Sequence, residues 1–315
     1  MPERLGPPLD KPLFKRVALI GLGLIGSSIA RAVKHLNLAG TLVAIDRSEE
    51  VVARVRELGI ADEATTDFVA GVTNADLVIL CVPVGVCGAV AEVIKPGLKP
   101  GCIVSDVGSV KASVIAQVQP HLPEGVHFVP AHPVAGTEHS GPDAGFATLF
   151  HNRWCILTPP EGEDEGAIER VRAFWTAMGS NVEIMAAQHH DLVLAITSHV
   201  PHLIAYNIVG TAADLETVTQ GEVIKFSAGG FRDFTRIAAS DPTMWRDIFL
   251  HNKEAVLEML GRLNEDIALL ARAIRWGEGD KLHDLFTRTR AIRRGIISSG
   301  QETAEPDFGR RKDQA

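Results

Sequence analysis

The segment 17–46 constrains the fold of this chain more than any other. An apolar run leads into Gly21-x-Gly23-x-x-Gly26, and an amphipathic stretch of small residues then leads to a second apolar run that ends at Asp46. Gly21 permits a tight turn between strand and helix, Gly23 lets the backbone approach a pyrophosphate, and Gly26 lets the helix pack closely on the strand. The helix N-terminus presents N–H groups and a positive dipole end to an anion. This order of elements predicts a dinucleotide-binding turn.

Asp46 indicates which dinucleotide is bound. It stands about 20 residues after Gly26, close to the spacing expected of the carboxylate that accepts hydrogen bonds from the adenosine ribose. A carboxylate there repels a 2′-phosphate, so NAD is favoured over NADP. Arg47 leaves NADP open, because an arginine can pair with that phosphate. We expect cofactor contacts at Gly21, Gly23, Leu24, Ile25, Gly26, Asp46, Arg47, Val82, Pro83 and Ser109.

The composition is typical of a soluble globular protein. The 315 residues are enough for two domains, and 46% of them are apolar while 22% are charged. A net charge of -8 argues against nucleic acid as a partner. The apolar runs look shorter than the roughly 20 residues of a membrane span, so no membrane association is expected. The start of the chain lacks the apolar core of a signal peptide, and the four cysteines form no CxxC pair, which indicates reduced thiols in a cytoplasmic protein.

Short apolar runs alternate with helical patterns in the first half of the chain. Strands are expected over 17–20, 41–45, 76–82, 102–105, 127–130, 153–157 and 182–184. Helices are expected in the amphipathic segment after the glycine turn and over 48–58, 85–94, 111–119 and 165–178. This alternation predicts an α/β fold of the Rossmann type, with a mostly parallel, doubly wound sheet.

Helical periodicity replaces this alternation from about residue 186 onward. We expect helices over 187–211 and 280–297, and one unusually long helix from Thr243 to about Trp276 that follows the start signal Ser240-Asp241-Pro242. A helix of that length is typical of a bundle or a dimer interface. The expected organisation is a flexible arm (1–14), a dinucleotide-binding domain (15–185), an all-helical substrate and dimerisation domain (186–297) and a flexible tail (298–315).

Residues that follow the strands are candidates for chemistry, because doubly wound sheets bind ligands beyond the carboxyl ends of their strands. His132 follows the strand expected over 127–130 and is held by Pro133. With an ordinary pKa of about 6.5, a histidine beside a nicotinamide suits the role of general base for an alcohol proton. Ser109 can hydrogen-bond to that imidazole or to the cofactor's carboxamide, and it is equally suited to cap a helix.

The helical part offers two pairs of polar residues. His199 and His202 stand three residues apart, but Pro201 lies between them and no third ligand motif is present, so we predict a substrate contact and no metal. Arg232 and Arg236 stand one helical turn apart after two glycines. Such a pair can present an arginine fork to a carboxylate, or it can form surface ion pairs such as Asp233 with Arg236.

Most of the candidate residues named above lie in five segments of the sequence. They are GLGLIGSS, DVGSVK, AHPVAGTEHSG, TSHVPH and GGFRDFTRIAASDPTMWRDIFLHN. Together they resemble the prephenate/arogenate (cyclohexadienyl) dehydrogenase family of tyrosine biosynthesis, over roughly residues 16–295. Members of that family oxidise prephenate or arogenate with loss of CO₂, giving 4-hydroxyphenylpyruvate or tyrosine. The resemblance implies an NAD-dependent oxidoreductase with a small-molecule substrate and a homodimer formed by the helical domain. Few residues precede the first strand or follow the last helix, so no mutase or amino-acid-sensing domain is expected.

The resemblance also implies roles for individual residues. His132 resembles the histidine that takes the proton of the ring 4-hydroxyl, and Ser109 resembles the serine that orients it. His202 resembles a substrate-contacting histidine, and Arg236 the arginine that binds a substrate carboxylate. Further substrate contacts are expected at Ser198, Glu138, Asp233 and Trp245. Glu138 and Asp233 are expected to form an ionic gate with Arg236.

Two other functions stay open on the sequence alone. A β-hydroxyacid or 6-phosphogluconate-type dehydrogenase shares the two-domain plan, but it relies on a catalytic lysine where this chain offers His199 and His202. A protein that only senses NAD would need the glycine turn but would have no use for His132 and Arg236 in one crevice. Between the two substrates, acidic residues would favour the ammonium of arogenate and the arginines the keto acid, and we expect prephenate to be accepted.

Overall fold

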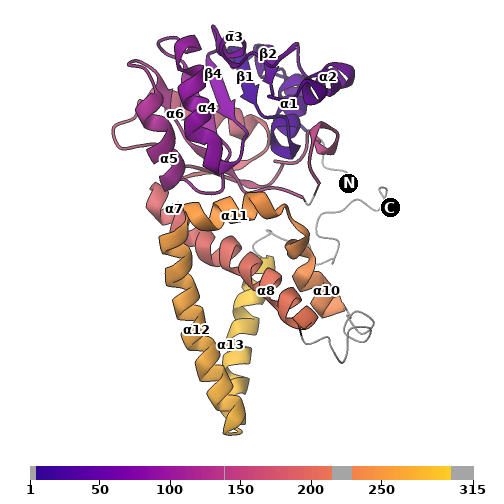
Figure 1. Cartoon of the computed structure of the whole chain (residues 1–315), viewed down its shortest axis with the longest axis vertical. Helices are drawn as coiled ribbons and strands as arrows, with labels where there is room; N and C mark the ends of the chain where they lie inside the picture. The colour runs from indigo at the N-terminus through magenta and orange to yellow at the C-terminus, as the bar shows by residue number, and fades with distance from the viewer. Residues whose placement is uncertain (1–4, 138, 215–228, 299–315) are drawn as a thin grey trace. The chain divides into compact units, whose positions relative to one another are not determined.

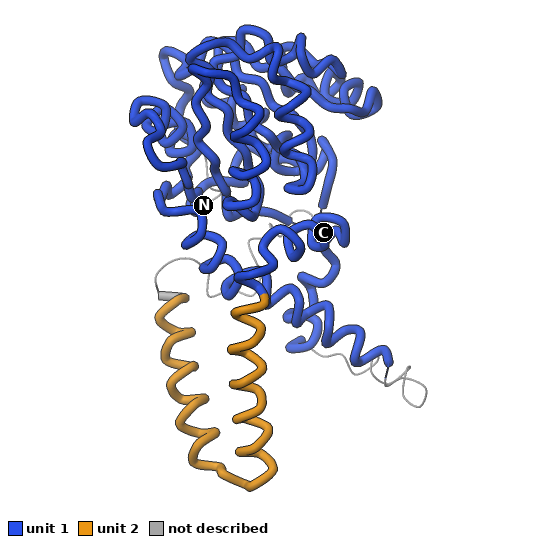
Figure 2. Tube along the Cα trace, turned by 60° about the vertical axis from the view of Figure 1, so that its left-hand side comes forward, with its two compact units in different colours: residues 1–256 blue, residues 257–315 orange. Residues whose placement is uncertain are grey.

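The computed structural model describes residues 5–137, 139–214 and 229–298 (Figure 1). The chain divides into two compact units, residues 1–256 and 257–315 (Figure 2). All the strands of the described residues lie in the first unit. The predicted tail, from residue 299 on, lies outside the described residues. Leu9 and Leu13 of the predicted N-terminal arm donate backbone hydrogen bonds to Leu36 and Leu38.

The first unit is built on a parallel sheet. Among the described residues it has six strands in the order β3-β2-β1-β4-β5-β6. These strands are β1 (Phe14–Ile20), β2 (Ala39–Ile45), β3 (Glu63–Thr65), β4 (Leu77–Leu80), β5 (Ile103–Asp106) and β6 (His127–Phe128). The strand order reverses between β1 and β4, which in doubly wound sheets is the point where ligands bind. The glycine turn directly follows β1 at this point.

Helices cover both faces of the sheet, as the predicted doubly wound fold requires (Figure 1). On one face of the sheet, a hydrophobic cluster contains buried side chains of α1 (Leu24–Leu36), α2 (Glu49–Leu58) and α6 (Glu165–Ala177). On the other face, a second hydrophobic cluster contains buried side chains of α3 (Phe68–Val72), α4 (Cys87–Ile94) and α5 (Ala112–Val118). Short turns of 3₁₀ helix are η1 (Val84–Val86), η2 (Lys95–Gly97), η3 (Gln119–His121) and η4 (Pro142–Ala144). The sequence pattern missed β3 and α3, because elements of three and five residues are too short to display a period.

The further strands predicted over 153–157 and 182–184 form a second sheet. It contains β7 (Ala131–Pro133), β8 (Trp154–Leu157) and β9 (Asn181–Ile184). β7 pairs antiparallel with β8, and β8 pairs parallel with β9. The chain turns away from the main sheet after Phe128, and His132 therefore lies inside a strand and not after one.

A nearly continuous helical stretch follows the second sheet. It consists of α7 (Ala187–Leu194), the π-helical turn η5 (Ala195–His199) and α8 (Val200–Asp214). Pro201 has no N–H to give to the carbonyl of Thr197, and a wider turn at this point accommodates that missing bond. By length and composition alone the 28-residue stretch Ala187–Asp214 could cross a membrane, although the apolar runs of the sequence predicted no membrane span. It carries the buried polar residues His190, Asp191 and His199, and the core helix of a soluble protein passes the same test.

The predicted single helix from Thr243 to Trp276 is wrong, because it breaks at Asn252. α11 (Pro242–His251) ends there and α12 (Lys253–Arg275) begins immediately after it. The side-chain nitrogen of Asn252 donates to the backbone oxygen of Asp191 at 2.9 Å and lies 3.0 Å from Nδ1 of His199. This tertiary contact holds Asn252 outside helical geometry. The predicted start is confirmed, since Asp241 accepts a hydrogen bond from the N–H of Met244 and Pro242 follows it.

The second unit contains the greater part of α12 and the helix α13 (Gly279–Ser298). Large apolar side chains on both helices are more than half exposed to solvent. They are Leu257, Ile267, Leu269, Ile274, Phe286 and Ile292. Between the two helices, Trp276 is 72% exposed. An apolar surface of this extent is typical of an interface with another chain.

Candidate active site

The turn between β1 and α1 has the geometry that its glycines predicted. Gly21 has a φ of +94°, and a Cβ there would collide with the carbonyl oxygen of Cys81. A Cβ on Gly26 would collide with the carbonyl oxygen of Gly21. Gly23 instead faces open space, and it caps α1 without any side-chain hydrogen bond. Two glycines are thus required by close packing, and the third leaves the helix N-terminus uncovered for an anion.

Asp46 connects the end of β2 to this turn. Its Oδ2 accepts a hydrogen bond from the N–H of Leu22, and its Oδ1 accepts one from the N–H of Ser48, both at 3.0 Å. A carboxylate has further lone pairs, which can accept from ribose hydroxyls. The open Gly23, the uncovered helix end and this carboxylate together fit a dinucleotide, and Arg47 beside them is exposed.

The other predicted cofactor residues lie around the same turn. Leu24 and Ile25 form the first turn of α1, and their half-buried side chains pack on the hydrophobic cluster of that face. Val82, just after β4, lies 3.1 Å from the position that a Cβ on Gly21 would take. Pro83 follows it and is exposed. Val82 and Pro83 therefore follow the end of β4, which neighbours β1 where the strand order reverses.

His132 is buried in β7, where it pairs with Ile156, and the residue is 7% exposed. Its Nδ1 lies 2.8 Å from Nε2 of His190, and the two rings meet edge to face with their centroids 5.0 Å apart. Burial lowers the pKa of His132 well below its usual value, and His190, Lys111 and His199 lower it further. His132 is therefore neutral at physiological pH and able to accept a proton.

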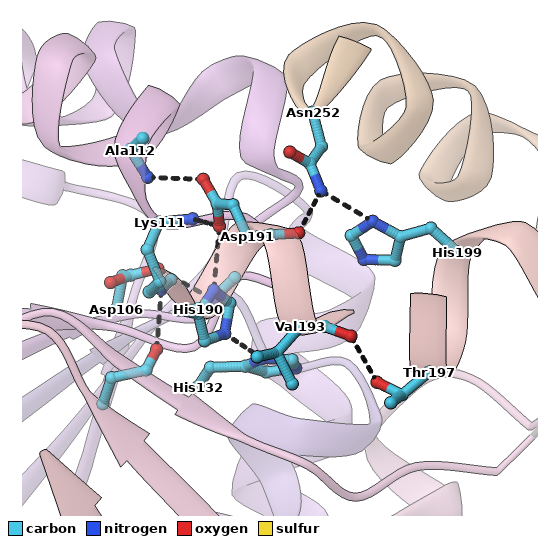
Figure 3. A network of polar contacts seen from close by, with 12 residues as sticks. Asp106, Lys111, Ala112, His132, His190, Asp191, Val193, Thr197, His199 and Asn252 are labelled. Carbon is cyan, nitrogen blue, oxygen red and sulfur yellow. Dashed lines mark hydrogen bonds and ion pairs between the residues drawn. The ribbon is translucent and has the colours of Figure 1, made fainter. Parts of the chain in front are cut away.

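His132 belongs to a buried polar network that sequence reasoning missed (Figure 3). Nδ1 of His190 lies 2.8 Å from Oδ1 of Asp191, and both residues come from the first turns of α7. Nζ of Lys111 lies 2.5 Å from Oδ2 of Asp106 and donates to the backbone oxygen of Ala131 at 2.7 Å. The signal for His190 and Asp191 in the sequence was a run of four polar residues at the start of α7, 188–191, and no motif marks it.

Asp191 caps α5 from a distant part of the chain. Its Oδ1 accepts from the N–H of Lys111 at 2.8 Å, and its Oδ2 accepts from the N–H of Ala112 at 2.9 Å. The capping role that the sequence suggested for Ser109 is therefore wrong, since the residue at the helix start is Lys111 and its cap comes from Asp191. Ser109 lies half-buried after β5, and its hydroxyl makes no hydrogen bond within the described part of the chain. It stays free to contact a ligand.

The predicted residues of the helical part gather around Trp245. Trp245 is 6% exposed and its ring stacks on that of His202, with centroids 3.6 Å apart. The rings of His199 and Trp245 meet edge to face, with their centroids 6.1 Å apart. Nδ1 of His202 donates to the backbone oxygen of Ser198 at 2.8 Å, which leaves its Nε2 as an acceptor. Burial lowers the pKa of His202, and it lowers the pKa of His199 to about 4.

Two buried donors of this cluster have no hydrogen-bond partner within the described residues. They are Nε1 of Trp245 and Nε2 of His199. Because Asn252 donates to Nδ1 of His199, the proton of that neutral ring is on Nε2. Buried donors are rarely left unsatisfied in native proteins, so both are suited to oxygen atoms of a ligand. No group of three or more His, Cys, Asp or Glu side chains within the described residues could hold a metal ion.

Arg236 and Asp233 lie on the segment after residue 228. Asp233 is exposed in α10 (Gly229–Thr235), and its carboxylate lies 3.9 Å from Nε of Arg232. Arg236 opens the 3₁₀ turn η7 (Arg236–Ala239) and is half-buried, and its charge lowers the pKa of His202 further after burial. The structure therefore brings Arg236 close to the Trp245 cluster. Glu138 lies outside the described residues, so the ionic gate stays a prediction.

Comparison with known proteins identifies the family. Residues 29–184 match the family model "Prephenate dehydrogenase, nucleotide-binding domain", and residues 186–288 match "Prephenate dehydrogenase, dimerization domain". The chain belongs to the prephenate dehydrogenase family. It is 45% identical to the cyclohexadienyl dehydrogenase of Zymomonas mobilis, over 89% of this chain and 96% of that one. It is 34% identical to the prephenate dehydrogenase of Bacillus subtilis, over 89% of this chain and 76% of that one.

Solved structures of prephenate dehydrogenases share the fold. That of Aquifex aeolicus, in complex with hydroxyphenyl propionate and NAD⁺, matches with a TM-score of 0.83 and 32% identity over 90% of this chain and 98% of that one. The arogenate dehydrogenase of Synechocystis matches with a TM-score of 0.76 and 26% identity over 89% of this chain and 99% of that one. The resemblance read from the sequence motifs is confirmed, as is a nucleotide-binding domain followed by a helical dimerization domain.

Proposed function

We propose that this chain catalyses the NAD-dependent oxidative decarboxylation of prephenate, and of arogenate where it is offered, in tyrosine biosynthesis. Membership of the prephenate dehydrogenase family supports the reaction. The observation that carries the proposal is a buried, neutral histidine, His132, in the same unit as a dinucleotide turn and near His199, whose Nε2 has no hydrogen-bond partner within the described residues. The products are 4-hydroxyphenylpyruvate from prephenate and tyrosine from arogenate.

The glycine turn would hold the cofactor, and Asp46 selects NAD. Gly23 leaves the N-terminus of α1 open to the pyrophosphate, and Asp46 faces the same turn. When bound, NAD⁺ supplies the hydride acceptor for the ring carbon that carries the hydroxyl group. Ser109, free of hydrogen bonds within the described residues, is suited to the carboxamide of the nicotinamide. The cofactor would also contact the residues around this turn, which are Leu24, Ile25, Val82 and Pro83.

His132 holds and returns one proton. In the reaction the ring hydroxyl loses its proton as C4 loses hydride, and the ring carboxylate leaves as CO₂. The two electrons of the broken carbon–carbon bond complete the aromatic ring, and the phenol oxygen then takes a proton back. His132 accepts the proton in the first step and returns it in the last, so the overall reaction consumes none. Because burial keeps the ring neutral, it is ready to act at physiological pH.

Side chains of the helical part anchor the substrate. Arg236 provides a cation for a carboxylate, and its guanidinium can bind it with two hydrogen bonds. His202, stacked on Trp245, presents Nε2 as an acceptor, and Ser198 lies one turn before it. Asp233, and Glu138 outside the described residues, would repel a second carboxylate or attract an ammonium. The arginine favours prephenate, whereas these acidic groups make arogenate a second substrate.

The chain also forms a homodimer in this proposal. A dimerization domain is matched over residues 186–288, and the second unit exposes the large apolar side chains of α12 and α13. We place the boundary between the dinucleotide-binding and helical domains near residue 185, with the arm before residue 15 and the tail after residue 297. The enzyme acts in the cytoplasm, in keeping with four cysteines that are free thiols.

The test is NADH formation at 340 nm with prephenate and with arogenate, each with NAD⁺ and NADP⁺. The wild type should turn over prephenate with NAD⁺. His132→Ala should lower kcat by roughly 10²–10⁴-fold and leave the affinity for NAD⁺ unchanged, because a general base contributes about that factor. Absence of turnover with both substrates would overturn the proposal, and so would an undiminished kcat in His132→Ala.

A further inference from the structure

We propose that His190 and Asp191 are positioning residues that fix the tautomer of His132. In this arrangement Nδ1 of His132 carries the proton, and Nε2 carries the lone pair that receives the substrate's proton. The inference rests on the proposed function of His132 as general base. It assigns a role to two residues that no sequence motif marks and that the proposed mechanism does not use.

The direction of each hydrogen bond follows from the carboxylate. Both oxygens of Asp191 already accept backbone hydrogen bonds, from the N–H groups of Lys111 and Ala112. An ionised carboxylate has acceptors only, so Nδ1 of His190 donates to Oδ1 across 2.8 Å. A neutral imidazole with its proton on Nδ1 has its lone pair on Nε2. Nε2 of His190 therefore accepts, and Nδ1 of His132 donates across 2.8 Å.

His190 is neutral in this environment. The residue is fully buried, and burial lowers its pKa, although the hydrogen bond to Asp191 opposes the shift. The charged groups around the pair come from β5 and α5, where Asp106 and Lys111 form a buried ion pair. Lys111 opposes a second positive charge on either histidine. Because Asp191 fixes the proton of a neutral His190 on Nδ1, the Nε2 of His190 accepts from His132, and no charge is added beside His132.

Three elements hold the carboxylate in place. Asp191 lies in α7, its side chain caps α5, and its backbone oxygen accepts from Asn252 at the end of α11. Figure 3 shows these contacts meeting at Asp191, with His190 between Asp191 and His132. A carboxylate in direct contact with His132 would stabilise its protonated form and raise its pKa. The interposed ring of His190 fixes the tautomer while the base keeps its lowered pKa.

The matched variants separate orientation from packing. In His190→Gln the side-chain oxygen can still accept from Nδ1 of His132, whereas His190→Met has a similar size and no comparable acceptor. We expect His190→Met to lower kcat by about 10²-fold with KM for prephenate and NAD⁺ within twofold, because a wrong tautomer removes the base and not the binding site. His190→Gln should recover at least a tenth of the wild-type kcat. His189→Met, at the exposed neighbouring histidine, is the control and should leave kcat unchanged.

A measurement without turnover reads the tautomer directly. Nitrogen-15 NMR of the full-length protein, with the His132 signals assigned by His132→Gln, should show Nδ1 protonated and Nε2 unprotonated in the wild type. His190→Met should shift the proton toward Nε2, and His190→Gln should restore it to Nδ1. Thermal unfolding of each variant shows whether it is folded at the assay temperature.

The outcomes distinguish the inference from the function on which it rests. If wild type and His190→Met share the same kcat and the same tautomer, His190 does not position the base and the inference is wrong. If His190→Gln loses as much kcat as His190→Met while both stay folded, hydrogen-bond acceptance is not the cause, and the inference is again wrong. If the wild type turns over neither substrate, or His132→Ala keeps its kcat, the proposed function itself has failed.

Discussion

Lys111 and Asp106 form an ion pair 2.5 Å apart in which neither side chain is exposed to solvent. The ammonium also donates to the backbone oxygen of Ala131, the residue before His132. Burial raises the pKa of Asp106, and the charge of Lys111 opposes that shift. The pair thus connects the end of β5 and the start of α5 to the strand that carries the proposed base.

Removal of one member of this pair should be costly, because it leaves an uncompensated charge in the protein interior. We expect Lys111→Met to lower the free energy of unfolding by about 3–5 kcal/mol, and Lys111→Met with Asp106→Leu to recover most of that loss. Urea unfolding at a fixed protein concentration measures both. As a control, Arg262→Met removes an exposed ion pair with Glu258 and should change stability by less than about 1 kcal/mol. Equal losses in the single and double variants would contradict the prediction.

The glycine turn predicts opposite effects for two similar substitutions. Gly26→Ala places a methyl group against the carbonyl oxygen of Gly21, so it should lower the free energy of unfolding by about 1–3 kcal/mol. Gly23→Ala places its methyl group more than 4 Å from any heavy atom of the described residues beyond its two chain neighbours, so it should change stability by less than about 1 kcal/mol. It should instead weaken NAD⁺ binding at least tenfold, because the methyl group occupies the approach to the helix N-terminus. Thermal unfolding and titration calorimetry check the two effects, and normal NAD⁺ binding by Gly23→Ala would contradict this site.

The preference for NAD should depend on the charge of Asp46. Asp46→Asn keeps an acceptor oxygen for one of the two N–H groups that Asp46 accepts from, and it removes the charge that repels a 2′-phosphate. We expect the ratio of kcat/KM for NAD⁺ to that for NADP⁺ to fall about tenfold, which corresponds to about 1.4 kcal/mol. Arg47→Ala in the Asp46→Asn background should then reduce the use of NADP⁺, since Arg47 is the exposed cation beside the site. An unchanged ratio in Asp46→Asn would place the selection of the cofactor elsewhere.

Sequence reasoning succeeded where the signal is local. The glycine turn, Asp46 after the second strand and the cap at Asp241 each depend on residues close together in the chain, and the structure has all three. It failed where distant segments meet. The sequence suited Ser109 equally to a helix cap and to a ligand contact, but the cap of α5 comes from Asp191, about 80 residues from Lys111 in the chain.

The same reason explains the other misses. The long helix after Thr243 breaks because Asn252 bonds to α7 and η5, which helical periodicity does not register. His190 joins the site only because α7 docks against β7, so its position in the sequence carries no motif. The β7 strand leaves the main sheet although the residues around it read as one more strand of it. Tertiary contacts decided each of these cases.

Acid should destabilise the protein through its buried histidines. Burial lowers the pKa of His199 from 6.5 to about 4, so between these values the unfolded chain binds more protons than the folded protein and stability falls as the pH falls. From pH 6.5 to pH 5 His199 accounts for a loss of up to about 2 kcal/mol. His199→Asn keeps an acceptor for Asn252 but does not titrate. Urea unfolding at pH 7 and pH 5 should therefore show a smaller loss for this variant than for the wild type, and an equal loss would mean that His199 is not the source.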